Sequence, residues 1–247
     1  MTDPITASTG DEQLIHRLVV LDMAGTTVAD GGLVERAFAA AATRHLGTEP
    51  ETPAFATMLD HVRATMGESK ISVFRHLAGG DETRAREANA EFERAYGALV
   101  AEGNCAPVPG APEAIAALRE AGRTVVLTTG FARATQDAIL DALGWRDLVR
   151  LTLCPADTGP HGRGRPHPDL VLAALLRTGA ADDVREVAVA GDTAYDMRSG
   201  VRAGVGVVAG VLTGAHEKDA LRAGGATHVL GSVAELPELL ASLEAPS

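Results

Sequence analysis

The sequence predicts an α/β fold in which a doubly wound parallel sheet carries an inserted, all-helical domain. Two observations lead to this prediction. Short, nearly continuous apolar runs alternate with helical patterns over most of the 247 residues, and such runs are typical of strands covered on both faces. One long segment interrupts this alternation with helical patterns alone. Alternating strands and helices with right-handed crossovers build a parallel sheet, so the interruption indicates an insertion.

The main domain is predicted to contain six strands and five helices. The predicted strands are Arg17–Leu21, Thr124–Leu127, Val149–Leu153, Glu186–Ala190, Val205–Ala209 and Thr227–Leu230. The predicted helices are Pro112–Ala121, Ala132–Leu143, Pro168–Thr178, Asp196–Ala203 and Val233–Leu243. The third of these helices has the wide apolar stripe expected of a helix that packs on a sheet; its members are Leu170, Ala173, Ala174 and Leu176.

The inserted helical domain is predicted at residues 33–103, and the main domain at residues 1–32 and 104–247. Asp30-Gly31-Gly32 leads into the insertion and Pro107-Val108-Pro109-Gly110 leads out of it, and both segments are typical of hinges. Within the insertion, apolar residues spaced by three or four mark the buried face of an amphipathic helix; they are Ala85, Ala88, Phe92, Tyr96 and Leu99.

The composition is that of an ordinary globular protein, and its negative net charge argues against some classes of binding partner. Apolar residues make up 46% and charged residues 22% of the chain, which excludes a disordered or fibrous protein. The formal net charge of −11 argues against nucleic acid as a partner, because binding it requires a basic surface. The negative charge does not exclude a small ligand that carries a phosphate group, because a metal ion and a few local hydrogen-bond donors can bind such a group.

Cysteine usage and the amino terminus indicate a cytoplasmic protein. Cys105 and Cys154 are too few for a disulfide scaffold and lack the spacing of a metal site. Acidic residues stand near the amino terminus, where a signal peptide is cationic, and no apolar run is long enough to span a bilayer. We therefore expect no membrane partner, and the choice between a monomer and a homodimer stays open.

Polar side chains cluster in the loops after four predicted strands. Ligands of parallel sheets bind beyond the carboxyl ends of the strands, so these loops are expected to lie together. The four loops offer a carboxylate, a hydroxyl, a cation and a pair of carboxylates, which suits a metal ion and a phosphoryl group. Their sequences are Asp22-Met23-Ala24-Gly25-Thr26-Thr27, Thr128-Thr129-Gly130, Gly164-Arg165-Pro166 and Gly191-Asp192-Thr193-Ala194-Tyr195-Asp196.

The chemistry of these loops favours phosphoryl transfer. A carboxylate can attack an anionic phosphoryl group only if a cation neutralises the repulsion between them. Asp22 and Asp192 supply the hard oxygen ligands that Mg²⁺ prefers, while Thr129 and the permanently charged Arg165 are suited to bind the phosphoryl oxygens. Each motif alone has a structural reading, as a helix cap or a turn. Four such motifs in order, each after a strand, favour catalysis.

These residues resemble the haloacid dehalogenase (HAD) superfamily of phosphotransferases from about Arg17 to Leu230, and within it the phosphonoacetaldehyde hydrolase (phosphonatase) subgroup. The resemblance implies a HAD-type Rossmannoid sheet with a helical cap that closes over the substrate. It rests on Asp22-Met23-Ala24-Gly25-Thr26-Thr27, Thr129-Gly130, Arg165-Pro166, Gly191-Asp192-Thr193 with Asp196, and Met66-Gly67-Glu68-Ser69-Lys70.

The resemblance also implies a role for each of these residues. Asp22 is the implied nucleophile that becomes an aspartyl phosphate, and Lys70 is the implied cap lysine that forms an imine with an aldehyde. Mg²⁺ is expected to bind Asp22, the backbone carbonyl of Ala24 and Asp192, with Asp196 in support. Thr129 and Arg165 are the other implied catalytic residues. The implied substrate-binding residues are Gly25, Thr26, Met66, Gly67 and Gly130.

Ala24 and Lys70 point to the same leaving group. Most HAD phosphatases carry a second aspartate two residues after the nucleophile, where it protonates the leaving alkoxide and contributes about 10²- to 10⁴-fold. Ala24 occupies that position here. Cleavage of a carbon–phosphorus bond instead needs an electron sink, which an iminium on Lys70 provides. This role requires a neutral amine, so the pKa of Lys70 must fall from its usual value of about 10.4.

The chain departs from the phosphonatase pattern at three positions, and two other functions stay open. Val73, Phe131 and Gly32 replace a histidine, an aromatic hydroxyl and a cysteine of that subgroup, so the predicted substrate is a phosphonate that need not be phosphonoacetaldehyde. One alternative is a phosphatase of small phosphate esters, similar to phosphoglycolate phosphatases, with Lys70 as a solvated cap lysine. The other is a non-enzymatic receiver that accepts phosphate on Asp22 as a signal.

Overall fold

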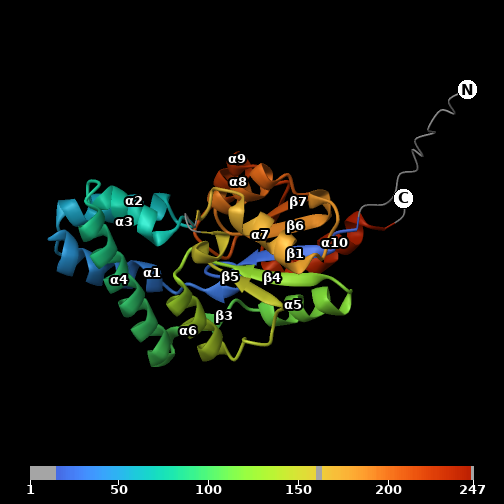
Figure 1. Ribbon diagram of the computed structural model, residues 1–247, viewed down its shortest axis with the longest axis horizontal. Helices are drawn as coiled ribbons and strands as arrows, with labels where there is room; N and C mark the ends of the chain where they lie inside the picture. The colour runs from blue at the N-terminus through green and yellow to red at the C-terminus, as the bar shows by residue number, and fades with distance from the viewer. Residues whose placement is uncertain (1–14, 160–162, 246–247) are drawn as a thin grey trace, which may run out of the picture.

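A six-stranded parallel sheet forms the centre of the protein, as the computed structural model shows for residues 15–159 and 163–245 (Figure 1). The strand order is β5-β4-β1-β6-β7-β8, with β1 in the middle and every neighbouring pair parallel. This arrangement confirms the predicted doubly wound sheet. The strands are β1 (Leu18–Asp22), β4 (Thr124–Thr128), β5 (Leu151–Leu153), β6 (Val187–Gly191), β7 (Val207–Val211) and β8 (His228–Leu230).

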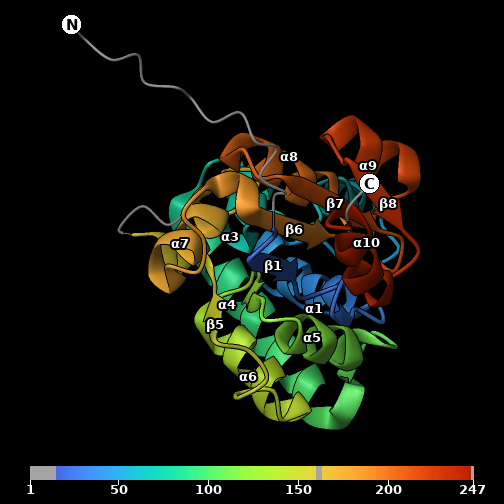
Figure 2. The same cartoon turned by 90° about the vertical axis from the view of Figure 1, so that its right-hand side faces the viewer.

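Helices cover both faces of the sheet, because successive strand residues point to opposite faces. In β1, Val19 and Leu21 pack into a core shared with α5, α6 and α10, whereas Leu18 and Val20 pack into a core shared with α7. Figure 2 shows the sheet between these layers. The helices are α5 (Ala111–Glu120), α6 (Arg133–Leu143), α7 (Asp169–Thr178), α8 (Ala194–Ala203), α9 (Lys218–Gly224) and α10 (Leu236–Leu243).

Four further helices form a second body at one side of the sheet, which we call the helical unit (Figure 1). It contains α1 (Leu33–Ala41), α2 (Pro53–Ala64), α3 (Lys70–Leu77) and α4 (Glu82–Leu99). Its interior is built from aromatic rings, with Phe74 5.8 Å from Phe92 and 6.3 Å from Phe38 between ring centroids. The helical pattern predicted for this stretch matches these four helices.

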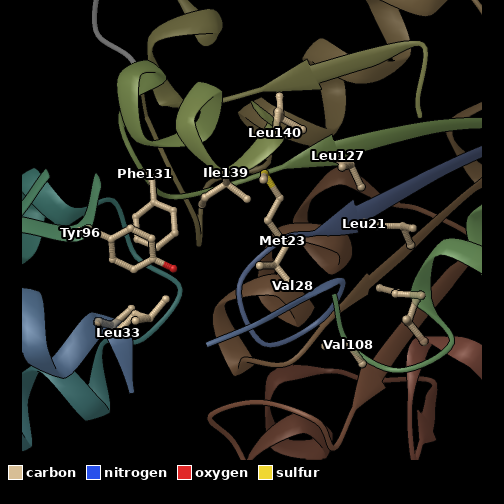
Figure 3. Packing of buried hydrophobic residues seen from close by; sticks show 14 of the residues in the cluster. Leu21, Met23, Val28, Leu33, Tyr96, Val108, Leu127, Phe131, Ile139 and Leu140 are labelled. Atoms are coloured by element: carbon tan, nitrogen blue, oxygen red, sulfur yellow. The ribbon is translucent and has the colours of Figure 1, made fainter. Parts of the chain in front are cut away.

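The helical unit and the sheet share one apolar core. Figure 3 shows Tyr96 of α4 against Phe131, which follows β4, with Met23 and Val28 alongside. The ring centroids of Tyr96 and Phe131 are 4.6 Å apart, and all four side chains belong to a single buried cluster. Continuous apolar packing of this kind fixes how the helical unit sits on the sheet.

The structure differs from the sequence-based expectations at several element boundaries. The predicted strand Val205–Ala209 begins two residues later, because Val205 belongs to the end of α8. Gly204 adopts φ +82° there, and the Val205 N–H donates to the carbonyl of Gly200, a bond typical of a glycine-terminated helix. Two elements were not predicted: the helix α9, with only Leu221 and Gly224 buried, and an antiparallel pair of short strands at the two hinges, β2 (Val28–Ala29) and β3 (Ala106–Pro107).

Among residues 15–159 and 163–245, no helix combines the length and the apolarity that crossing a bilayer requires.

Candidate active site

Three carboxylates meet at the carboxyl edge of the sheet. Asp22 is the last residue of β1, Asp192 directly follows β6, and Asp196 lies in the first turn of α8. The register pairs Asp22 with Thr128 of β4 and Leu21 with Ala190 of β6, so these strands end side by side. One oxygen from each carboxylate lies within 4.8 Å of the others, and all three side chains are buried.

Arg165 lies between two of these carboxylates. Its Nη2 is 2.6 Å from Asp22 Oδ1, and its Nε is 2.7 Å from Asp196 Oδ1. Nη2 also donates a hydrogen bond of 2.7 Å to the hydroxyl of Thr128. Burial opposes the charge of the guanidinium, but the attraction of Asp196 and Asp22 prevails, so the pKa of Arg165 is raised.

The carboxylate cluster carries more negative charge than Arg165 balances. Burial raises the pKa of Asp22 well above its usual value, with repulsion from Asp196 and Asp192 adding to the effect and Arg165 opposing it. Burial and Asp196 likewise raise the pKa of Asp192 to about 7. Closely spaced, buried carboxylates of this kind are stabilised by a bound cation. Three hard oxygen donors are a suitable set for a divalent metal ion.

Local hydrogen bonds fix Asp192 and Asp196. The Ala215 N–H donates to Asp192 Oδ2 at 2.8 Å, and the Thr26 hydroxyl donates to Asp192 Oδ1 at 3.2 Å. The Thr193 N–H donates to Asp196 Oδ2 at 3.1 Å and the Asp196 N–H donates to Thr193 Oγ1 at 3.3 Å, which forms the capping box of α8. The Thr193 hydroxyl also donates to Asp196 Oδ2, at 2.5 Å. Asp196 therefore takes part in a helix cap as well as in an ion pair with Arg165.

Glycine at position 25 allows the loop after β1 to approach Asp192. Gly25 has φ +85°, and a Cβ atom there would lie 2.4 Å from Asp192 Oδ2. A side chain would therefore both strain the backbone and overlap the carboxylate.

A cavity of about 500 Å³ separates the carboxylates from the helical unit. Ten of the twelve site residues predicted from the sequence line it. Thr26 and Asp196 do not: Thr26 is fully buried behind Asp192, and Asp196 faces Arg165. The ten that line it are Asp22, Ala24, Gly25, Met66, Gly67, Lys70, Thr129, Gly130, Arg165 and Asp192.

The loop that leads to Lys70 is seated on the sheet's loops by close backbone contacts. A Cβ atom on Gly67 would lie 2.4 Å from Thr193 Oγ1, and one on Gly130 would lie 2.8 Å from the carbonyl oxygen of Glu68. The Lys70 N–H donates to the Gly130 carbonyl at 3.4 Å. These contacts place the first residue of α3 at the rim of the cavity.

Lys70 lines the cavity and lies near an aromatic ring. Its side chain is buried, and Nζ lies 5.6 Å from the centre of the Phe131 ring. Burial lowers the pKa of Lys70, whereas the carboxylates of Asp30, Glu93 and Asp22 act in the opposite direction. The direction of the net shift is the one that a nucleophilic amine requires.

The sequence pattern that defines haloacid dehalogenase-like hydrolases matches residues 16–204 of this chain. The chain belongs to this hydrolase family. The predicted resemblance is thereby confirmed, and the matched stretch runs from β1 to the end of α8. Membership of a hydrolase family favours an enzyme over the non-enzymatic receiver considered above.

Curated relatives of this hydrolase include phosphonoacetaldehyde hydrolases. That of Hahella chejuensis is 29% identical in an alignment that covers 92% of this chain and 86% of the relative. That of Bacillus cereus is 30% identical over 209 residues, which cover 81% and 76%. A solved structure of a phosphonoacetaldehyde hydrolase-like protein from Oleispira antarctica superposes with a TM-score of 0.75 at 22% identity, covering 92% of each chain, and supports the fold.

Several cavity residues of this hydrolase were not predicted from the sequence. Asp30 was considered only as part of a hinge, and Glu35 and Arg63 lie on helices whose polar residues look like ordinary surface. In the structure Arg63 Nε and Nη2 donate to the two carboxylate oxygens of Glu35 at 2.6 and 2.9 Å. The segment 213–215 was missed because the preceding strand was predicted to end at Ala209, two residues short of its end.

Proposed function

We propose that this hydrolase cleaves the carbon–phosphorus bond of a small phosphonate that carries a carbonyl group, with Mg²⁺ as cofactor. The observation that carries the proposal is that Asp22 and Lys70 line the same cavity, while Ala24 stands where a phosphatase has its general acid. The site therefore offers a nucleophile for phosphorus and an amine for carbon, while position 24 lacks the carboxyl group that protonates an alkoxide in a phosphatase.

The residues present fit Mg²⁺, since they supply carboxylate oxygens at one edge of the cavity. Asp22, Asp192 and the backbone carbonyl of Ala24 are the proposed ligands, with Asp196 in support. When bound, Mg²⁺ neutralises negative charge on the phosphoryl group and on Asp22, so that one anion can approach the other.

At phosphorus, Asp22 is the proposed nucleophile. Arg165 Nη2 lies 2.6 Å from Oδ1 of Asp22 and thereby orients the carboxylate. Arg165 and the hydroxyl of Thr129 are the groups proposed to bind the phosphoryl oxygens, and Gly25 and Gly130 would let the backbone come close to them. The step yields an aspartyl phosphate on Asp22, which water then hydrolyses.

At carbon, the neutral amine of Lys70 adds to the carbonyl group and water leaves, which gives an iminium ion. When the carbon–phosphorus bond breaks, its electron pair moves into the iminium and forms an enamine, while phosphorus bonds to Asp22. Protonation of the enamine carbon and hydrolysis of the imine then release the carbonyl product and regenerate Lys70.

The rarity of lysine in this chain supports a special role for Lys70. Of the 22 basic residues, only Lys70 and Lys218 are lysines. Arginine cannot act as a neutral amine, because its guanidinium stays protonated in proteins. Lys218 is exposed at the start of α9, whereas Lys70 is buried at the cavity.

We further propose that residues 33–103 act as a cap domain. The helical unit bears Lys70 and the loop with Met66 and Gly67, so its seating on the sheet brings the amine to Asp22. Closure also removes water from the cavity, which favours the neutral amine.

A phosphatase acting on small phosphate esters is the second candidate. It is favoured by the completeness of the phosphoryl half of the site: Asp22, Thr129 and Arg165 do not depend on Lys70. Val73 and Phe131, which replace polar residues of phosphonatases, also favour it.

A substrate panel with a trapping experiment separates the two candidates. Phosphonoacetaldehyde and other β-oxo phosphonates are compared with p-nitrophenyl phosphate on the wild type, Lys70→Ala and the control Lys218→Ala. We expect Lys70→Ala to lose phosphonate cleavage by about 10²-fold or more and to keep ester hydrolysis, and borohydride to leave an adduct on Lys70 alone. Phosphonate cleavage that survives Lys70→Ala, or an active substrate that leaves no adduct, would refute the proposal.

A further inference from the structure

We propose that Asp30 is a catalytic residue, which shuttles protons between the substrate's carbonyl oxygen and the nitrogen of Lys70 while the imine forms. The inference rests on the proposed function, because it assumes that Lys70 adds to a carbonyl group. It assigns the proton transfers of that reaction to a residue in the hinge between β2 and α1.

Asp30 and Lys70 face the same cavity from different elements. Asp30 follows β2, where the chain leaves the sheet, and Lys70 begins α3; both line the cavity that contains Asp22. Asp30 is the carboxylate with the largest electrostatic effect on Lys70, and Lys70 acts on Asp30 in return.

The two groups interact without touching. Both are described residues, yet no ion pair within 4.0 Å joins them. If Asp30 were simply the counter-ion of Lys70, its carboxylate would lie in direct contact with Nζ. A group that acts on the carbonyl oxygen must leave room for the reacting carbon and its oxygen between itself and Nζ, and a separation of more than 4.0 Å is compatible with this requirement.

Imine formation needs an acid and a base at this place. Attack by the amine creates an anionic oxygen and a cationic nitrogen, so a proton must reach the oxygen and another must leave the nitrogen. The hydroxyl group of the resulting carbinolamine then needs a second protonation before it departs as water. A carboxyl group beside the reacting carbon can perform each transfer in turn.

The other carboxyl groups near Lys70 are engaged elsewhere. Glu93 shares a neighbouring cavity with Lys70, but its carboxylate oxygens already accept hydrogen bonds from the hydroxyl of Thr135 and the N–H of Ala132. Asp22 pairs with Arg165, and Glu68 accepts a hydrogen bond from Tyr195.

Asp30 is held in place but keeps the capacity to bind a proton. Its oxygens accept long hydrogen bonds from the Gly32 N–H at 3.2 Å and the Val34 N–H at 3.3 Å. Burial outweighs these bonds and raises the pKa of Asp30. A carboxyl group with a raised pKa is protonated more often near neutral pH and is therefore a better acid catalyst there.

Protons and electrons balance in this step. The amine lone pair forms the carbon–nitrogen bond, the carbonyl π pair moves to oxygen, and oxygen takes the proton of the Asp30 carboxylic acid. The carboxylate then removes a proton from nitrogen. It returns this proton to the hydroxyl group, which leaves as water, while the nitrogen lone pair forms the iminium and Asp30 ends as a carboxylate.

The test measures adduct formation at Lys70 in Asp30→Asn and in Asp30→Glu. Asparagine keeps the size and an acceptor for the backbone N–H groups but cannot transfer the proton, whereas glutamate keeps the carboxyl group. With phosphonoacetaldehyde and borohydride, we expect Asp30→Asn to slow adduct formation by about 10²-fold and Asp30→Glu to recover part of the rate. A far-ultraviolet circular dichroism spectrum and a Tm like those of the wild type check that Asp30→Asn folds, and Asp30→Glu shows whether the carboxyl group itself is needed.

Glu93→Gln is the matched control, since it removes a carboxyl group on α4 that, like Asp30, acts to raise the pKa of Lys70. We expect it to change adduct formation by less than about threefold. Wild-type rates in Asp30→Asn, or an equal loss in Glu93→Gln, would overturn the role of Asp30 while leaving the Lys70 imine intact. A wild-type enzyme that cleaves phosphonoacetaldehyde without any adduct would instead overturn the proposed function.

Discussion

Replacing Gly67 with alanine tests whether the position of the Lys70 loop controls activity, independently of the stability of the whole protein. Gly67 has φ +93°, and a Cβ atom there would lie 2.4 Å from Thr193 Oγ1. Thr193 cannot simply turn away, because its hydroxyl donates to Asp196 at 2.5 Å. The loop must therefore lift from the sheet, and Lys70, three residues further on, must move with it.

The two effects of Gly67→Ala have different magnitudes. A left-handed backbone costs alanine about 1–2 kcal/mol, which corresponds to a fall in Tm of roughly 2–8 °C for a chain of this size. A displacement of Lys70 by about 1 Å is expected to cost about 10²-fold in phosphonate turnover. The ester activity, which does not use Lys70, should fall much less.

Gly79→Ala is the matched control for this experiment. Gly79 has φ +63°, and no atom lies within 4 Å of the place that a Cβ atom would occupy, so alanine there brings the backbone strain without the overlap. Thermal unfolding and steady-state kinetics are measured on both variants. We expect similar losses in Tm, but a loss of phosphonate turnover in Gly67→Ala alone. Equal kcat/KM values in the two variants would refute the reasoning.

Three further predictions concern the carboxylate cluster. Asp22→Asn should abolish turnover of phosphonates and esters alike, with a far-ultraviolet circular dichroism spectrum like that of the wild type; residual turnover above about 1% of the wild-type value would exclude Asp22 as the nucleophile. Removal of metal with EDTA should stop turnover. Because the folded-state pKa of Asp192 is raised to about 7, the metal-free protein should lose stability as the pH rises from roughly 4 to 7. Mg²⁺ should therefore raise Tm more at pH 8 than at pH 5.5, and an equal effect at both would contradict the assignment.

The site on the sheet was predictable because its residues follow apolar strands. The carboxyl ends of parallel strands meet at one edge of the sheet. Asp22, Thr129 and Asp192 each stand at the end of a predicted strand, so they were expected to lie close together. The register of β1 with β4 and β6 is the physical reason that they do.

The helical side of the cavity was not predictable in the same way. Glu35 and Arg63 reach the cavity through the packing of the helical unit on the sheet, and this packing depends on contacts between distant segments, such as Tyr96 with Phe131. Neither periodicity nor motif spacing reports such contacts. The same holds for the dual pairing of Arg165, whose position in a loop gave no sign that it contacts both Asp22 and Asp196.

The glycine contacts beneath the Lys70 loop have a practical consequence for enzyme engineering. Because Gly67 and Gly130 anchor this loop through main-chain atoms, side chains elsewhere on the rim are free to vary without dislodging the amine. A library of variants at Glu35 and Arg63 alone would thus test new phosphonate substrates while the reactive residues keep their positions. Randomising the glycines themselves would erase the very arrangement that such a screen sets out to exploit.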